Sequence, residues 1–294
     1  MEDCPYSGPE NASDPSDMIS MGADKPCARS WSQRGVLRTY VINLDRAPDR
    51  LAYMDAQLRE LGIGYERFQA VDRYEIDASV PEFDASGYAR LHGRRFHSGE
   101  VACYLSHVGV LRAFLRTDAS HALILEDDAR LSPDLMTILE AAMARTEEWD
   151  ILRLSSVNTG LRIPYSPLTG DYRFAIALTR EKGAAGYVVN RACAESFLDN
   201  LLPMRLAWDI AFDMEFLHGL KSVFVEPLPV GQKSNFATQV QTEVKVSKLP
   251  RTRYLTVFPY RAGIETRRFL YRGMRLLKGM IQVRSDRRGE SMAR

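Results

Sequence analysis

The 294-residue sequence has few cysteines and no long hydrophobic run, and these absences narrow its class. The four cysteines, Cys4, Cys27, Cys103 and Cys193, are too sparse for a disulfide framework and lack the spacing of metal ligands. No apolar stretch approaches the roughly 20 residues that a membrane-spanning helix needs. The first residues are acidic and polar, without the basic and apolar regions of a secretory signal. We therefore expect a cytoplasmic protein with reduced cysteines.

The sequence also lacks a strong excess of charge, because 39 Lys and Arg face 38 Asp and Glu. The net charge of +1 gives no indication of nucleic-acid binding. The charges are nevertheless uneven, since residues 251–294 hold twelve Lys and Arg and only three Asp and Glu. Residues 1–35 are rich in Ser, Pro, Asp and Gly, which predicts a disordered leader. We expect a folded domain over 36–250 and a basic extension over 251–294.

Short apolar runs alternate with amphipathic segments through most of this domain. Residues 37–44 and 65–71 are expected strands, and a helix between them, with Asp45 as its N-cap, follows from apolar residues at helical spacing. Residues 72–97 look irregular, and Ser98 is expected to cap the next helix. Further strands are expected at 122–125, 149–156, 172–178 and 183–190, with helices after Ser132 and near 191–202 and 208–219. This alternation predicts an α/β domain whose mostly parallel sheet carries helices on both faces.

The most informative segment is LILEDDA (123–129), in which an apolar strand ends in three acids, Glu126, Asp127 and Asp128. Ligands gather at the carboxyl ends of strands in open α/β sheets. Adjacent carboxylates repel one another unless a cation neutralises them, and Mg²⁺ and Mn²⁺ prefer such oxygen ligands. In continued strand geometry Glu126 and Asp128 point one way and Asp127 the other. We predict a divalent-metal site; the alternative is a solvated acidic turn in which Asp128 caps a helix.

Three segments in order resemble glycosyltransferase family 25, the lipopolysaccharide and lipooligosaccharide transferases related to collagen galactosyltransferases. They are VINLDRAPDR (41–50) with YERFQAVDR (65–73), SGEVACYLSH (98–107) and ALILEDDA (122–129). The resemblance covers about residues 37–235. The sequence departs from the family pattern where Val101 and Ala102 replace the usual Ile-Gly, and where Arg73 replaces a usual Gly after Asp72.

The resemblance implies a GT-A-type, Rossmann-like fold and an inverting transfer of a hexose from a UDP-sugar to a saccharide or lipid-linked oligosaccharide acceptor. Galactose is the hexose that it implies. It implies a place in lipopolysaccharide or other cell-surface glycan synthesis. It also implies Mn²⁺ or Mg²⁺ at Glu126 and Asp128, since a divalent ion stabilises the leaving diphosphate. Donor contacts are expected from Asn43, Asp45, Arg46, Arg50, Ser106, His107, Asp127 and Gly183.

Structural alternatives exist for several of these donor-binding residues. An Asp45–Arg pair could simply fix its loop, although Arg forks also match phosphate geometry. His107 could be a satisfied core residue rather than a ligand, and a helical Ser-His pair cannot face one ligand equally well. Glu100 could contact substrate or be a structural partner of a neighbouring arginine.

The catalytic base is expected in WDIAFDMEF (208–216), where Asp209 and Asp213 are spaced to share a helix face. The family places an Asp near here, and Asp209 is the better match, with Asp213 as the alternative base. Because the positive end of a helix favours the ionised carboxylate, we expect Asp209 to be a weak base. The alternative is that Asp209 only caps the helix.

Residues 263–283 separate into two arcs on a helical wheel. The basic arc holds Arg267, Arg268, Arg272, Arg275 and Lys278, and the apolar arc holds Leu270, Met274, Leu277 and Ile281. This pattern predicts a helix lying on an anionic membrane surface, peripheral on the inner face. The alternative is a surface helix packed on the domain. No aromatic platform supports RNA binding, so no nucleic-acid partner is expected.

Two other functions compete with glycosyl transfer. A metal-dependent nucleotidyltransferase would need a glycine- and lysine-rich phosphate loop near the first strand, and INLDRAPDR contains no glycine. A transferase-like membrane scaffold without catalysis would have no need of the intact acidic triplet.

Overall fold

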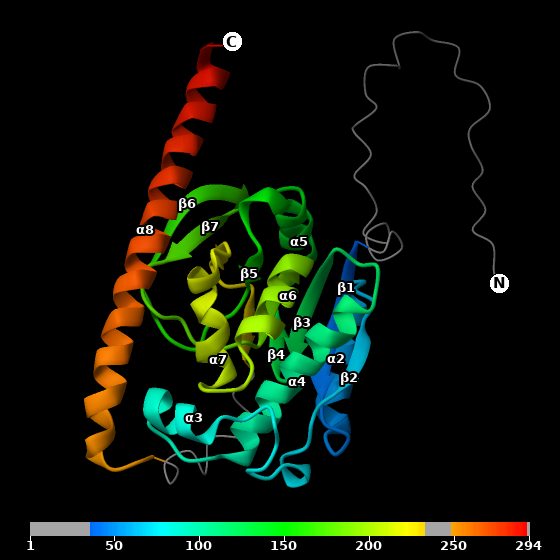
Figure 1. The fold of residues 1–294 in the computed structure, drawn as a ribbon. Helices are drawn as coiled ribbons and strands as arrows, with labels where there is room; N and C mark the ends of the chain where they lie inside the picture. The colour runs from blue at the N-terminus through cyan, green and yellow to red at the C-terminus, as the bar shows by residue number, and fades with distance from the viewer. Residues whose placement is uncertain (1–35, 233–247, 293–294) are drawn as a thin grey trace, which may run out of the picture.

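The central feature of the fold is an eight-stranded sheet with helices on both faces (Figure 1). The computed structural model describes residues 36–232 and 248–292, so the predicted leader over 1–35 lies outside the described residues. The strands, in their order across the sheet, are β2 (Glu66–Gln69), β1 (Leu37–Asn43), β3 (His121–Glu126), β8 (Gly186–Asn190), β5 (Ile151–Arg153), β9 (Ser222–Glu226), β7 (Tyr172–Ala177) and β6 (Arg162–Thr169). A separate ribbon pairs β4 (Ala129–Leu131) with β10 (Val230–Gln232).

The sheet is mixed in direction. Strand β1 pairs in parallel with β2 and β3, and β5 pairs in parallel with β9. Strand β8 lies antiparallel between β3 and β5, while β7 and β6 add two antiparallel pairs at the far edge. The predicted α/β class, with one large sheet between helices, is confirmed. The antiparallel β8 matters for function, because its beginning lies at the same edge as the carboxyl ends of β1 and β3.

Successive side chains of the buried strands point to opposite faces of the sheet, so they pack into two core layers. Tyr40 of β1 packs toward one face with α4 and α6, whereas its neighbour Val41 packs toward the other with α2 and α5. The helices are α2 (Pro48–Glu60), α3 (Ala85–His92), α4 (Ser98–Leu115), α5 (Leu135–Met143), α6 (Arg191–Asn200), α7 (Trp208–Ala211) and α8 (Tyr254–Met292). Short 3₁₀ helices are η2 (Arg73–Glu75), η3 (Thr146–Glu148), η4 (Phe212–His218) and η5 (Arg251–Arg253).

Three local expectations were wrong. The stretch 72–97 contains helix α3, which Asp84 caps by accepting from the Gly87 N–H. Helix α4 is capped by His97 and not by Ser98, because His97 Nδ1 accepts from the Glu100 N–H. Helix α2 has Ala47 at its N-cap and Pro48 in its first turn, so Asp45 does not cap it.

Helix α8 lies along the outside of the domain beside β6 and β7 (Figure 1). Its basic arc faces inward in part: Arg268 is 0% and Arg272 is 1% exposed. Its apolar arc faces outward, with Leu277 63% and Ile281 66% exposed. The predicted separation of the two arcs is therefore real, but the expectation that the basic arc faces a membrane was wrong for these two arginines. Within the described ranges, no helix has the length and apolar character needed to cross a bilayer.

Candidate functional site

A cavity of about 400 Å³ opens at the carboxyl ends of β1, β2 and β3. Helix α4, the loop before β8 and helix α7 also line it. Nine predicted site residues line it: Arg46, Arg50, Ser106, His107, Glu126, Asp127, Asp128, Gly183 and Asp209. The structure thus brings together residues that lie far apart in the sequence. Of the other predicted residues, Asn43, Asp45 and Asp213 do not line this cavity.

Arg50 and Asn43 organise the two aspartates of the acidic triplet. The Arg50 guanidinium bridges them, with Nη1 2.9 Å from Asp127 Oδ1 and Nη2 2.9 Å from Asp128 Oδ2. Asn43 Nδ2 donates to the other Asp127 oxygen at 2.8 Å and to the Ala47 carbonyl at 3.0 Å. Because both oxygens of Asp127 are engaged and Asn43 is buried, these two residues hold the triplet in place.

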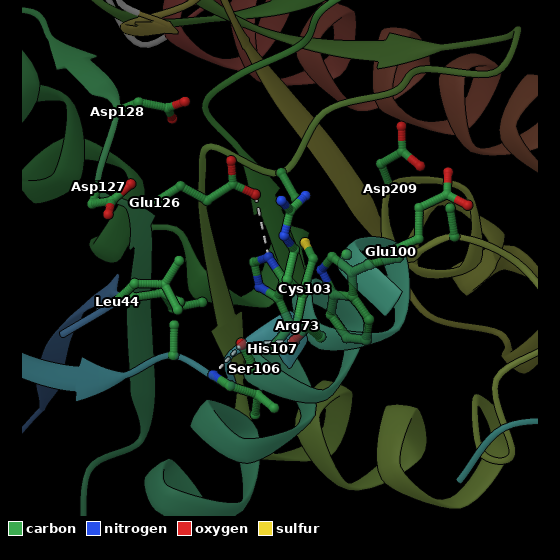
Figure 2. A pocket seen from close by; sticks show the side chains of 18 of the residues that line it. Leu44, Arg73, Glu100, Cys103, Ser106, His107, Glu126, Asp127, Asp128 and Asp209 are labelled. Carbon is green, nitrogen blue, oxygen red and sulfur yellow. Dashed lines mark hydrogen bonds and ion pairs between the residues drawn. The ribbon is translucent and has the colours of Figure 1, made fainter. Parts of the chain in front are cut away.

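Glu126 extends away from the two aspartates toward α4 (Figure 2). His107 Nε2 lies 3.3 Å from Glu126 Oε1, and His107 Nδ1 lies 2.9 Å from the Tyr187 hydroxyl. The imidazole stacks on Trp208, with ring centroids 5.0 Å apart and planes 6° apart. Both ring nitrogens have protein partners and the side chain is buried, so His107 orients Glu126 more directly than it could contact a donor.

The electrostatics of the triplet suit a bound cation. Burial, together with repulsion from Glu126 and Asp127, raises the pKa of Asp128 to about 6 even though Arg50 opposes the shift. Burial likewise raises the pKa of Asp127. Asp128 Oδ1 is buried and has no hydrogen-bond partner among the described residues. A divalent cation would supply the missing partner and relieve the repulsion, so Asp128 fits the metal-binding role predicted for it. Glu126 lines the same cavity, and its part in holding a metal stays a prediction.

Cys103, His107 and Glu126 form a second group whose ligand atoms lie within 4.8 Å of one another. Cys103 and His107 are one turn apart on α4. Burial raises the pKa of the Cys103 thiol well above its ordinary value, so the thiol stays protonated at neutral pH. Because metals bind the thiolate, this group favours a soft metal less than the carboxylates favour a hard one.

Ser106 shapes the cavity wall through the backbone. Its hydroxyl accepts from the Val71 N–H at 2.9 Å and donates to the Ala102 carbonyl at 2.7 Å. This fixes the segment after β2, where Asp72 caps η2 by accepting from the Tyr74 N–H. Arg73, which stands where the family pattern has glycine, lies on the cavity wall. The turn therefore forms without the glycine.

The arginines around the first loop have different roles. Arg46 lines the cavity, pairs with Asp72 and lies over the Tyr74 ring, 5.1 Å from its centroid. Asp45 instead pairs with Arg67 and accepts from Gln69 Nε2 at 2.7 Å. The structural alternative for Asp45, an ion pair that fixes its loop, is the one observed, with Arg67 as the partner.

Asp209 and Asp213 lie in very different surroundings. Asp209 lies at the cavity wall opposite Asp127 and Asp128 (Figure 2). Burial raises its pKa, and nearby Glu100 and Glu126 add to the shift against Lys182. The expectation of a weakened base was wrong, because loss of solvation outweighs the field of a helix that spans only four residues.

Asp213 was the alternative base, and its position contradicts that role. Its carboxylate is 0% exposed and lies 3.2, 3.1 and 2.9 Å from the nearest guanidinium nitrogens of Arg153, Arg268 and Arg272. The two aspartates do not share a helix face, since α7 ends at Ala211 and continues as the kinked 3₁₀ helix η4. Asp213 is thus a structural anion that attaches α8 to the domain.

Gly183 is at a position that only glycine fits easily. Its φ of +96° is in the region that side chains disfavour, and an added Cβ would lie 3.0 Å from the Val157 nitrogen. Its carbonyl accepts from Arg153 Nη2 at 3.1 Å. Gly183 also lines the cavity, and its contact with a donor stays a prediction.

Sequence reasoning missed two contributors to the cavity. Arg73 was noted only as a departure from the family pattern, although an arginine beside a predicted phosphate site was itself a signal. Trp208, directly before Asp209, is buried and supports His107 by stacking. The sequence left the role of Glu100 open between a substrate contact and a structural partner of an arginine. In the structure Glu100 pairs with Arg94, accepts from the Tyr88 hydroxyl and also lines the cavity.

Among known proteins, the chain is 28% identical over 188 residues to a glycosyltransferase 25 family member of Drosophila pseudoobscura pseudoobscura, covering 59% of this chain and 30% of that protein. A family member of Aedes aegypti is 33% identical over 127 residues, covering 40% and 21%. The human inactive glycosyltransferase 25 family member 3 is 31% identical over 132 residues, covering 42% and 22%. The chain thus spans less than a third of the length of these relatives.

Among solved structures, a glycosyltransferase involved in glycosylation of the major capsid of PBCV-1 is 9% identical, with a TM-score of 0.34 and coverage of 72% of this chain and 92% of that one. The family model described as glycosyltransferase family 25 (LPS biosynthesis protein) matches residues 36–214, more than half of the chain. All three segments that carried the resemblance lie within this match. The chain therefore belongs to glycosyltransferase family 25.

Proposed function

We propose that this chain is an active, metal-dependent glycosyltransferase that moves a hexose from a UDP-sugar to a saccharide acceptor. Galactose is the hexose that we propose. The observation that carries the proposal is the division of the cavity between two kinds of acid. Glu126 and Asp128 offer carboxylate oxygens on the side near β1 and β3, while Asp209 stands on the opposite side (Figure 2). Inverting transfer needs this separation, because the acceptor attacks opposite the departing diphosphate.

Each side has a defined task in this reaction. A divalent ion held by Glu126 and Asp128 would supply positive charge to the UDP leaving group. Arg46 and Arg73, which also line the cavity, would add positive charge for a diphosphate. Asp209 takes the proton from the acceptor hydroxyl as its oxygen bonds to the anomeric carbon and the bond to UDP breaks. Its raised pKa brings it nearer the range suited to a general base.

A screen of UDP-sugars tests this function. Purified protein is incubated with each UDP-hexose and either Mn²⁺, Mg²⁺ or EDTA, and UDP release is measured. We expect release that depends on the metal, with UDP-galactose among the best donors. Release of pyrophosphate from a nucleoside triphosphate would instead indicate a nucleotidyltransferase. No turnover with any donor would indicate a non-catalytic scaffold, the state that the name of the human relative describes for that protein.

We also propose that the outer face of α8 rests on a membrane surface, where a lipid-linked acceptor in cell-surface glycan synthesis would be found. Five large apolar side chains are more than half exposed along one side of the helix: Phe269, Leu270, Met274, Leu277 and Ile281. Two arginines of the opposite arc are buried against the domain. Attachment would therefore depend mainly on apolar insertion and less on charge than the sequence pattern indicates.

A further inference from the structure

A second cavity, of about 260 Å³, lies beside the first, and Arg94 lines both. It is formed by the end of α3, the loop before β8, and the start of α8. Six of its lining residues are basic: Arg94, Arg180, Lys182, Lys248, Arg253 and Arg261. None of its lining residues, within the described ranges, is an acid.

Most of this charge is not neutralised by the protein. Arg94 pairs with Glu100, but Arg180, Lys182 and Arg261 form no ion pair in the described part of the chain. Burial and the neighbouring Arg180 and Arg94 lower the pKa of Arg261, which is the effect of like charges held together. Grouping cations in this way costs stability, and a bound anion would recover it.

His92 is the second observation that indicates a ligand. His92 is one of the residues that line the cavity, is only 5% exposed, and neither ring nitrogen has a hydrogen-bond partner among the described residues. Buried polar groups are nearly always hydrogen-bonded, so two unsatisfied ring nitrogens in a residue beside a cavity need an explanation. Burial and the fields of Arg94 and Arg261 lower its pKa to about 3, so the ring is neutral and has one N–H to donate.

We propose that this second cavity binds a phosphate or diphosphate group carried by the saccharide acceptor. The inference rests on the proposed function and adds the class of acceptor to it. Arginine and lysine clusters suit a phosphoryl group with its several oxygens and more than one negative charge. The donor diphosphate has its own place at the acidic triplet, on the far side of the first cavity.

The position of the second cavity favours the acceptor over other anions. Ile210, which lines it, follows the proposed base Asp209, and Lys182 precedes Gly183 of the first cavity. An acceptor whose phosphate lies in the second cavity would thus extend its sugar toward Asp209. The same phosphate could belong to a soluble glycosyl phosphate or to a lipid-linked glycosyl diphosphate. Leu255 and Phe258, exposed on the same first turns of α8, offer a surface for a lipid chain.

Calorimetric titration with inorganic pyrophosphate tests the site directly. Divalent metal and UDP are both omitted, so the acidic triplet carries no cation that could bind pyrophosphate and no other diphosphate competes for the second cavity. We expect the double variant Arg180→Gln/Arg261→Gln to bind pyrophosphate at least about tenfold more weakly than the unaltered protein, because charge-assisted hydrogen bonds are lost. The control is Arg267→Gln, which removes one positive charge from the exposed side of α8 and should bind normally. Equal affinity in the double variant, or an equal loss in the control, would overturn the proposal.

A spectroscopic readout protects the test against misfolding of the variants. In the unaltered protein, pyrophosphate should shift the ring resonances of His92, because an anion offsets the surrounding cations and gives the ring a partner. If pyrophosphate binds and the His92 resonances stay unchanged, the anion lies elsewhere and the proposal is wrong. Neither readout needs turnover, so a protein that binds pyrophosphate here but releases no UDP would contradict the proposed function alone.

The source of the phosphate is decided by kinetics. Transfer is compared between a soluble glycosyl 1-phosphate and a polyprenyl-linked glycosyl diphosphate in detergent, each with the double variant and with Arg267→Gln. A KM raised about tenfold in the double variant for one substrate alone identifies that substrate as the source, and a rise for both shows that the cavity accepts either phosphate. If transfer prefers an uncharged saccharide and the double variant leaves its KM unchanged, the second cavity does not serve the acceptor.

Discussion

Arginines near α8 occur in two settings, which differ in whether a carboxylate lies beside the guanidinium. Arg268 and Arg272 are buried against Asp213 and Glu215, so positive and negative groups meet in one network. Arg180 and Arg261, at the second cavity, have no carboxylate partner among the described residues. Buried charges that have partners hold the fold together, whereas charges grouped without partners indicate a place for a ligand. The amino-acid composition alone cannot distinguish these two groups of arginines.

The same distinction separates the two aspartates that the sequence offered as bases. Asp213 is surrounded by arginines, whereas Asp209 lies at a cavity wall, makes no hydrogen bond within the described residues and has a raised pKa. The predictions below test whether the first is structural and the second catalytic.

Removal of Asp213 should have the largest effect on stability. In Asp213→Ala, Arg153, Arg268 and Arg272 lose their common partner, and breaking a buried ion pair in this way costs about 3–5 kcal/mol. Urea denaturation followed by circular dichroism measures the loss. Asp209→Asn is the matched control four residues away and should unfold near the urea concentration of the unaltered protein. Equal midpoints for Asp213→Ala and the unaltered protein would show that the network does not support the fold.

Asp209→Asn should in turn have the larger effect on catalysis. We expect transfer to the acceptor to fall about a hundredfold or more, the range for loss of a general base. Affinity for the UDP-sugar, measured by calorimetry, should hardly change, since Asp209 stands away from the acidic triplet. A variant that instead loses donor affinity would show that Asp209 holds the sugar and not the proton.

The pH dependence of transfer should report the same carboxylate. Burial raises the pKa of Asp209, and only the ionised form accepts a proton. The rate should therefore fall as pH drops through this raised pKa and level off above it. The profile of kcat/KM, measured with metal held saturating, should lose this acid limb in Asp209→Asn. An acid limb that persists unchanged in the variant would assign the titration to another group.

The smallest effect is expected on the outer face of α8. The double variant Leu277→Ser/Ile281→Ser should reduce binding to vesicles of mixed neutral and anionic lipid severalfold, because less apolar surface is available for insertion. Added salt should change binding little, and UDP-sugar hydrolysis in solution should not change. Sedimentation with vesicles measures both. If salt removes binding and the substitutions do not, charge would be the main source of attachment after all.

Local patterns were enough to predict the part of the fold that positions the first cavity. Strands β1 and β3 are short apolar runs, helices α2 and α4 have apolar residues at helical spacing, and β2 lies in one of the three segments that carry the family resemblance. Strand β6 was not predicted, because Pro164 and Pro167 are unfavourable within a strand. It is tolerated at the edge of the sheet, where its pairing with β7 is irregular next to both prolines.

The orientation of side chains across long sequence distances could not be predicted. The helical wheel of α8 separated its two arcs correctly, but Asp213, which draws Arg272 inward, lies 59 positions earlier in the chain. Likewise, the roles of Asn43 and Arg50 became visible only when Asp127 and Asp128 lay beside them. The sequence was enough to single out these acidic residues, whereas their partners depend on the tertiary fold.

Metal-dependent UDP release by the Asp128→Asn variant tests the central claim most directly. Asp128 has a buried oxygen without a partner among the described residues and lies in a triplet that a cation would neutralise. We predict that the purified variant stays folded and loses nearly all of its Mn²⁺-dependent UDP release, because several kcal/mol of leaving-group stabilisation depend on the metal. Near-normal release by the folded variant at the same Mn²⁺ concentration would contradict the account.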